Sequence, residues 1–161
     1  MGLADGNAMD RFRTNSHTTT VPLSQDAALV TALAGTAMPF AHSTQDQVER
    51  WLRAMRLHGR VGAAMQALGV GEVSLVERDD SADPAAISHP DPDAAQHVLE
   101  RADEIAIAHR ASTLGTVDLL CALFDVYGPL MEGALYERGA SRDELMARIA
   151  EMDERAETAA L

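Results

Sequence analysis

The side chains that could carry out a reaction are few in this chain, and they do not form a catalytic pattern. Cys121, the single thiol, lies in the apolar run 119–123, where a cysteine is typical of a packed core rather than of a nucleophile. The carboxylates of Glu100, Asp103 and Glu104 share one predicted helix, as carboxylates do on many acidic helices. We therefore predict that the protein is not an enzyme and that it has no catalytic residues.

The histidines and glycines also lack the spacings of known binding sites. The six histidines show no His-x-x-x-His or Cys/His spacing, which argues against a metal site. Gly69-Val-Gly71 fits the end of a helix better than a phosphate-binding loop. A Gly-x-x-x-x-Gly-Lys-Ser/Thr loop cannot occur, because the chain contains no lysine. The sequence predicts no bound metal and no cofactor.

Composition restricts the kind of partner and the compartment. The chain has 25 acidic and 13 basic side chains and a formal charge of -12, which repels nucleic acid and anionic lipid. No apolar run reaches the roughly 20 residues that span a membrane, and the N-terminus does not resemble a signal peptide. A single cysteine fits a reducing compartment. We expect a cytoplasmic protein that binds neither nucleic acid nor membranes.

Hydrophobic periodicity predicts an all-α fold. Aromatic residues are scarce, and a core of Ala, Leu, Val and Met favours closely packed helices. A flexible arm is expected over 1–22 and an acidic, proline-rich linker over 79–92. The predicted helices cover 25–37, 44–57, 61–68, 72–78 and 93–111, followed by helices that begin at Thr116, Pro129 and Ser141; residues 153–161 form a C-terminal tail.

Several residues mark where these helices begin and end. Ser24 is expected to cap the first helix, and either Ser43 or Thr44 begins the second. Capping boxes are expected at two later helices, and glycines in the left-handed conformation are expected at two helix ends. The boxes are Asp93 with Gln96 and Ser141 with Glu144, and the glycines are Gly69 and Gly139.

The two halves of the chain resemble each other at an offset of about 70 residues, the pattern of a duplicated unit. Thr44–Leu52 matches Thr116–Phe124, and Ala64–Val70 matches Ala134–Ala140. We predict a duplicated four-helix repeat around one shared core, with repeat one at 25–78, repeat two at 93–152 and eight helices in total.

The stretches 101–106, 114–123 and 134–140 resemble the Clp amino-terminal repeat, which opens the Clp and Hsp100 unfoldases. The usual pattern of that repeat is Gly-Thr-Glu-His-Leu-Leu-x-Ala-Leu followed by a helix that ends in Leu-x-x-Leu-Gly-Val. The resemblance implies that residues 23–161 form a Clp-N-like domain, a pseudo-twofold bundle of eight helices, without an ATPase module.

The resemblance also implies a function. Clp amino-terminal domains bind adaptors and substrate proteins, and the family precedent is a monomer. We therefore expect a non-catalytic protein- or peptide-binding module of a Clp protease system, whose partner is a Clp ATPase, an adaptor, or a substrate protein or peptide. It would act as an adaptor or as a competitor of an unfoldase N-domain. The alternative is a decoy that sequesters Clp-targeting cyclic peptide antibiotics or another small ligand.

Candidate binding residues follow from the same resemblance. Gln45 and Val117 stand where some Clp domains use a glutamate to hold phosphoarginine, and neither can replace that carboxylate. We therefore do not expect phosphoarginine binding. Asp46 and Asp118 replace the histidine that follows. Either they substitute for the glutamate from one residue along, a step of about 100° around the helix, or they have the simpler role of a favourable interaction with the helix dipole. Phe12 could supply an aromatic residue that the family uses near its start.

Two surface features have two interpretations each. The arginines Arg50, Arg53, Arg56 and Arg60 form a basic stripe that either pairs with the protein's own acids or docks an acidic partner. The eight methionines, Met38, Met55, Met65, Met131 and Met146 among them, either line an adaptable groove or fill a core that is poor in aromatics.

Overall fold

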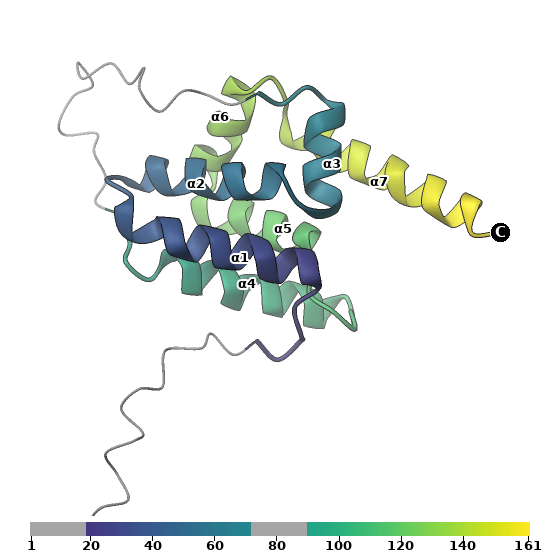
Figure 1. The fold of residues 1–161 in the computed structure, drawn as a ribbon, viewed down its shortest axis with the longest axis horizontal. Helices are drawn as coiled ribbons and strands as arrows, with labels where there is room; N and C mark the ends of the chain where they lie inside the picture. The colour runs from purple at the N-terminus through teal and green to yellow at the C-terminus, as the bar shows by residue number, and fades with distance from the viewer. Residues whose placement is uncertain (1–18, 72–89) are drawn as a thin grey trace, which may run out of the picture.

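The computed structural model describes residues 19–71 and 90–161, and this part of the chain is helical (Figure 1). The prediction of an all-α fold is confirmed. The helix predicted over 72–78 and Phe12 lie outside the described residues. Within them the helices are α1 (Gln25–Ala37), the 3₁₀ helix η2 (Met38–Phe40), α2 (Thr44–Arg56), α3 (Gly59–Ala67), α4 (Ala94–Ala108), α5 (Thr116–Tyr127), α6 (Pro129–Glu137) and α7 (Arg142–Ala159).

Most of the predicted helix starts are confirmed. The Ser24 hydroxyl accepts a hydrogen bond from the Ala27 N–H at 3.2 Å, and the Ser43 hydroxyl accepts one from the Asp46 N–H at 3.0 Å. At α7 both bonds of the predicted capping box form, because Ser141 accepts from the Glu144 N–H and the Glu144 carboxylate accepts from the Ser141 N–H. Each bond satisfies an N–H group that the helix itself leaves unpaired.

The capping box predicted at α4 is wrong. The Asp93 side chain makes no capping bond, and the Gln96 amide instead donates to Glu100 at 2.8 Å, one turn along the helix. Asp91 accepts a hydrogen bond from the Asp93 N–H at 2.9 Å. The turn before α4 is therefore stabilised by Asp91 and not by the predicted pair of Asp93 and Gln96. α4 also ends before the predicted Ala111, because Arg110 adopts a φ of 55°.

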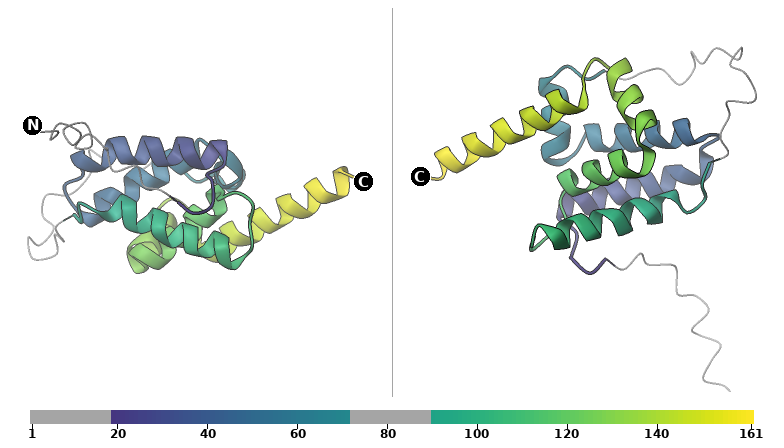
Figure 2. Two further views of the ribbon diagram at one scale, coloured as in Figure 1. Left: turned by 90° about the horizontal axis from the view of Figure 1, so that it is seen from below. Right: turned by 180° about the vertical axis from the view of Figure 1, so that it is seen from behind.

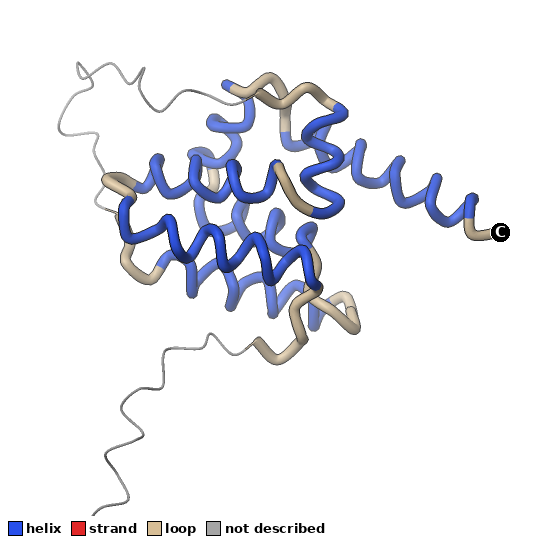
Figure 3. The backbone as a smooth tube through the Cα atoms, viewed as in Figure 1, coloured by secondary structure: helices blue, strands red, loops and turns tan. Residues whose placement is uncertain are grey.

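Two helices end in the same way. Gly69 after α3 has a φ of 71° and Gly139 after α6 has a φ of 95°, as predicted for left-handed caps. The residue after each glycine donates back into the last helical turn: Val70 to the Met65 carbonyl at 3.0 Å, and Ala140 to the Leu135 carbonyl at 3.3 Å. In Figure 3 these ends lie where the helices give way to loops.

The helices from the two halves of the chain pack into one bundle (Figures 1 and 2). α1 packs on α2 and α4 packs on α5, while α2 also contacts α6 and α3 contacts both α5 and α7. α7 projects from the bundle, and it continues as a helix through most of the predicted tail at 153–161. Near the start, the Asp103 carboxylate accepts hydrogen bonds from the N–H groups of Thr20 and Val21, so 19–21 lie against α4 although the arm was predicted to run to residue 22.

The core draws on both halves. Trp51, Met55 and Leu52 from α2 are buried with Leu119, Leu120 and Leu123 from α5, as the helical periodicity predicts. Met55, Met65 and Met131 are fully buried, which confirms the core interpretation for these three methionines. In the described ranges no single helix is long and apolar enough to cross a membrane, and α5 and α6 pass such a test only together, across a bend of 115°.

Candidate interaction surface

The two aspartates singled out by the sequence both act at helix starts. Asp46 is buried at the start of α2, where its carboxylate accepts from the His42 N–H at 3.0 Å and pairs with Arg50 at 3.3 Å. Asp118 is half-buried at the start of α5, and its carboxylate accepts from the Gly115 N–H at 2.9 Å. Both contacts satisfy free backbone donors and place negative charge at a positive helix end. This arrangement supports the simpler role predicted for both residues.

Gln45 and Val117, the residues before these aspartates, are placed differently. Gln45 is exposed on α2, whereas Val117 is half-buried against the core. Thr116 at the start of α5 lies close to Gly59, which follows the C-terminal end of α2. Asp46 and Asp118 therefore lie at opposite ends of α2, and the structure does not bring the four residues into one site.

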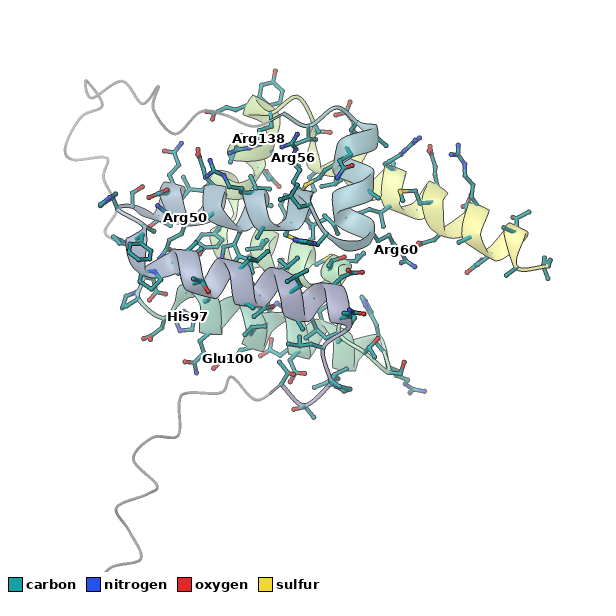
Figure 4. All side chains as sticks on the ribbon, in the orientation of Figure 1. Arg50, Arg56, Arg60, His97, Glu100 and Arg138 are labelled. Carbon is teal, nitrogen blue, oxygen red and sulfur yellow. The ribbon has the colours of Figure 1, made fainter. Side chains whose placement is uncertain are left out.

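The predicted basic stripe separates into three environments (Figure 4). Arg50 pairs with Asp46 and donates to the Phe40 carbonyl at 3.1 Å, while Arg60 pairs with Asp153 of α7 at 2.9 Å. For these two arginines the structure confirms pairing with the protein's own acids. Arg53 is exposed, and it makes no hydrogen bond or ion pair within the described part of the chain.

Arg53 and Arg56 instead meet a third arginine where α2 approaches α6. Figure 4 shows Arg56 beside Arg138, and all three arginines line one small depression, which we call the basic hollow. Its volume is about 10 Å³, roughly what one water molecule needs. Apolar side chains and backbone complete its walls, and the full lining is Leu52, Arg53, Arg56, Met65, Val70, Gly71 and Arg138. Among residues 19–71 and 90–161, no carboxylate lines this hollow.

Two of these arginines also hold the backbone around the hollow. The Arg56 side chain donates through Nε to the Val70 carbonyl at 3.0 Å, and the Arg138 side chain donates to the Ala134 carbonyl at 2.9 Å. Gly71 donates its N–H to the Arg138 carbonyl at 3.3 Å, which ties the segment after α3 to the end of α6. The guanidinium groups are thus fixed at the junction between the two halves of the chain.

A buried ion pair lies behind the basic hollow. Arg138 Nη2 and Glu49 Oε2 are 3.5 Å apart, and their side chains are 7% and 6% exposed. The pair joins α2 to α6, so it connects elements from the two halves of the chain. Burial leaves neither charge well solvated, and each therefore depends on the other for compensation.

A second polar contact is buried between α2, α5 and the start of α4. The Gln47 amide donates to the Asp91 carbonyl at 2.7 Å, and the Tyr127 hydroxyl donates to the Gln47 side-chain oxygen at 3.4 Å. Trp51 lies alongside and is fully buried. Burial raises the pKa of Tyr127 to about 12, although the nearby Trp51 N–H acts in the opposite direction.

This raised pKa predicts a loss of stability at high pH. Folding favours the protonated phenol, so the stabilisation is complete below pH 10 and is lost as the pH rises toward 12. We expect wild type to lose about 1–2 kcal/mol more than Tyr127→Phe between these limits, after allowance for solvent screening. Urea unfolding of both proteins at each pH measures the difference, and equal losses would contradict the assignment.

The groups that could support chemistry are placed in ordinary structural roles. Cys121 is half-buried on α5, and burial, followed by the charge of Asp118, raises the pKa of its thiol. A raised pKa disfavours the reactive thiolate. His97 contacts Asp91 at 2.8 Å on the exposed side of α4. Across residues 19–71 and 90–161 no group of three or more His, Cys, Asp or Glu side chains could hold a metal ion.

Arg138 is the residue of this surface that the sequence analysis missed. It follows α6 as a lone basic residue, and its neighbours in the sequence give no sign of Glu49 or of the arginines on α2. The matched helix ends at Gly69 and Gly139 indicate a repeated unit, but they do not predict that the Gly71 N–H donates to the Arg138 carbonyl. Comparison of the chain with models of known protein families and with curated proteins found no match.

Proposed function

We propose that this protein is a non-catalytic protein- or peptide-binding module of a Clp protease system, folded as a duplicated Clp-type N-domain. The observation that carries the proposal is the reciprocal packing of the two halves. α2 of the first half contacts α6 of the second, and α5 of the second half contacts α3 of the first. A duplicated unit with a pseudo-twofold axis requires this exchange of partners.

Local details support the same relationship. α3 and α6 each end in a left-handed glycine followed by a residue that donates back into the last turn. α2 and α5 each carry an aspartate in the first turn whose carboxylate accepts a backbone N–H from the residues before the helix. Such details arise together when one helical unit has been copied, and they extend the match between the halves beyond the sequence pattern.

The chemistry of the described residues favours binding over catalysis. The single thiol is half-buried with a raised pKa, and the buried carboxylates of Asp46 and Glu49 are engaged with Arg50 and Arg138. A Clp-type N-domain has no unfolding activity of its own. Its effect would come from occupying adaptors or substrates, as an adaptor or as a competitor of the unfoldase N-domain.

A degradation assay tests this proposal. Excess protein is added to a Clp unfoldase and its peptidase from the same host, with a substrate whose degradation requires the unfoldase N-domain. We expect the rate of degradation of that substrate to change, falling if the protein competes and rising if it delivers cargo. A second substrate that bypasses the N-domain is the control and should be unaffected. Unchanged degradation of the first substrate would contradict the proposal.

A further inference from the structure

We propose that Asp103 of α4 and Leu114, which precedes α5, form a docking site for a short non-helical peptide of a partner protein. Residues 19–23 of this chain, which we call the strap, occupy that site as an internal competitor. The inference rests on the proposed function, since it assigns the class of ligand to a binding module. The strap lies beside the loop that joins α4 to α5 (Figure 1), so its contacts show what the site recognises.

Main-chain hydrogen bonds hold the end of the strap nearest to α1. The Leu114 N–H donates to the Pro22 carbonyl at 2.8 Å, and the Leu114 carbonyl accepts from the Ser24 N–H at 2.9 Å, which makes a parallel β-bridge. Addition of an extended segment through backbone hydrogen bonds is a common mode of peptide recognition. Because any peptide carries such backbone groups, this part of the site does not depend on the sequence of the ligand.

The other end of the strap supplies selectivity. The Asp103 carboxylate accepts from two successive donors, the N–H of Thr20 at 3.0 Å and the N–H of Val21 at 2.8 Å. The Val21 side chain is 9% exposed and belongs to the same buried cluster as Leu114, whereas Thr20 is exposed. The site therefore suits a peptide with an apolar residue in the place of Val21 and free N–H groups on that residue and the one before it.

The strap can leave this site while the first helix stays folded. The cap of α1 is the hydrogen bond from the Ala27 N–H to the Ser24 hydroxyl, and it does not involve the docking site. Among residues 19–23 only Val21 is buried, and Leu23 is partly buried. A segment with so few buried contacts opens at a lower free energy than the core. A partner peptide that makes the same contacts therefore competes with the strap.

The experiment measures binding of a fluorescein-labelled peptide with the sequence of residues 19–25 to the full chain by fluorescence anisotropy. Val21→Asp weakens the strap and leaves the docking site unchanged. The control is Val126→Asp, the same substitution at an exposed position of α5. We expect the peptide to bind Val21→Asp at least about tenfold more tightly than wild type or Val126→Asp, because the strap no longer competes. Val21→Ala should have an intermediate effect.

Two further measurements connect binding to the strap and to Asp103. Hydrogen exchange with mass spectrometry should show faster exchange of residues 19–23 in Val21→Asp than in wild type. Adding Asp103→Ala to Val21→Asp should weaken peptide binding at least about tenfold, because the peptide loses two hydrogen bonds to a charged acceptor. Far-UV circular dichroism checks that each variant folds.

Several results would overturn the assignment. These are no peptide binding by a Val21→Asp protein whose strap exchanges freely, equal binding by wild type, or binding that is unchanged by Asp103→Ala. Protection of residues 19–23 that persists in Val21→Asp would show the strap to be a fixed part of the fold, which also contradicts the proposal. Failure here is separable from failure of the proposed function, because the Clp degradation assay does not use this peptide: altered degradation without peptide binding removes only the present inference.

Discussion

Glu49→Gln is expected to lower the free energy of unfolding by about 3–5 kcal/mol, the usual cost of leaving a buried charge without its partner. The Arg138 side chain is 7% exposed, and Glu49 lies 3.5 Å from it. The neutral amide cannot balance the guanidinium charge, and Arg53 and Arg56 line the same hollow as Arg138. Urea unfolding followed by far-UV circular dichroism measures the change. If the m-value is the same in wild type and Glu49→Gln, a shift of the unfolding midpoint reports a change in stability.

A double variant separates the ion pair from simple packing. Replacing both partners, as Glu49→Leu with Arg138→Met, removes both charges and keeps apolar volume, so we expect it to be more stable than Glu49→Gln alone. The comparison matters for function because this pair joins α2 to α6 at the junction between the halves. A loss below about 1 kcal/mol for Glu49→Gln would show that Arg138 is solvated without its partner.

Gly62→Ala is expected to destabilise the protein, against the usual effect of such a change in a helix. Alanine normally favours a helix interior over glycine by roughly 0.5–1 kcal/mol. At Gly62 in α3, however, an added Cβ would lie 2.7 Å from the Met55 carbonyl oxygen and 2.9 Å from that of Arg56. Both contacts are to backbone at the end of α2, so relief requires α3 to move, and we expect a cost of about 1–3 kcal/mol.

Gly133→Ala in α6 is the matched control for this prediction. Nothing lies within 4 Å of a Cβ built at Gly133, and the residue is exposed in a helix of the same length as α3. We expect Gly133→Ala to raise the melting temperature and Gly62→Ala to lower it, measured by thermal unfolding under the same conditions. A rise in both variants would show that α3 and α2 do not approach as closely as described.

Features with local causes could be predicted from the sequence. Ser43, Gly69 and Gly139 act on backbone groups within a few residues, and each has the predicted role. The buried face of α2 also follows from a period that the sequence displays directly. The capping box at Asp93 failed because the Asp93 N–H, which the Gln96 side chain would have bound, donates to the Asp91 carboxylate instead. A sequence pattern does not show which of two nearby side chains, Asp91 or Gln96, binds the Asp93 N–H.

Features that depend on distant partners could not be predicted. Gln47 and Glu49 are buried on α2, although polar residues are usually exposed, because Asp91 and Arg138, far away in the sequence, compensate them. The basic stripe was assigned by helical spacing alone, and its division also depends on groups outside α2: the Asp153 carboxylate of α7 and the carbonyls of Phe40 and Val70. The close approach at Gly62 likewise depends on how α3 turns back on α2.

The most direct test of the proposed function uses the protein as bait in lysate of its own host, with quantitative mass spectrometry of what co-purifies. The account predicts that a Clp ATPase, its peptidase or one of its adaptors is enriched over a tag-only control. Enrichment should persist in the Gly133→Ala variant, which we expect to be fully folded. Absence of every Clp component from the enriched proteins, with the bait shown to be folded, would contradict it.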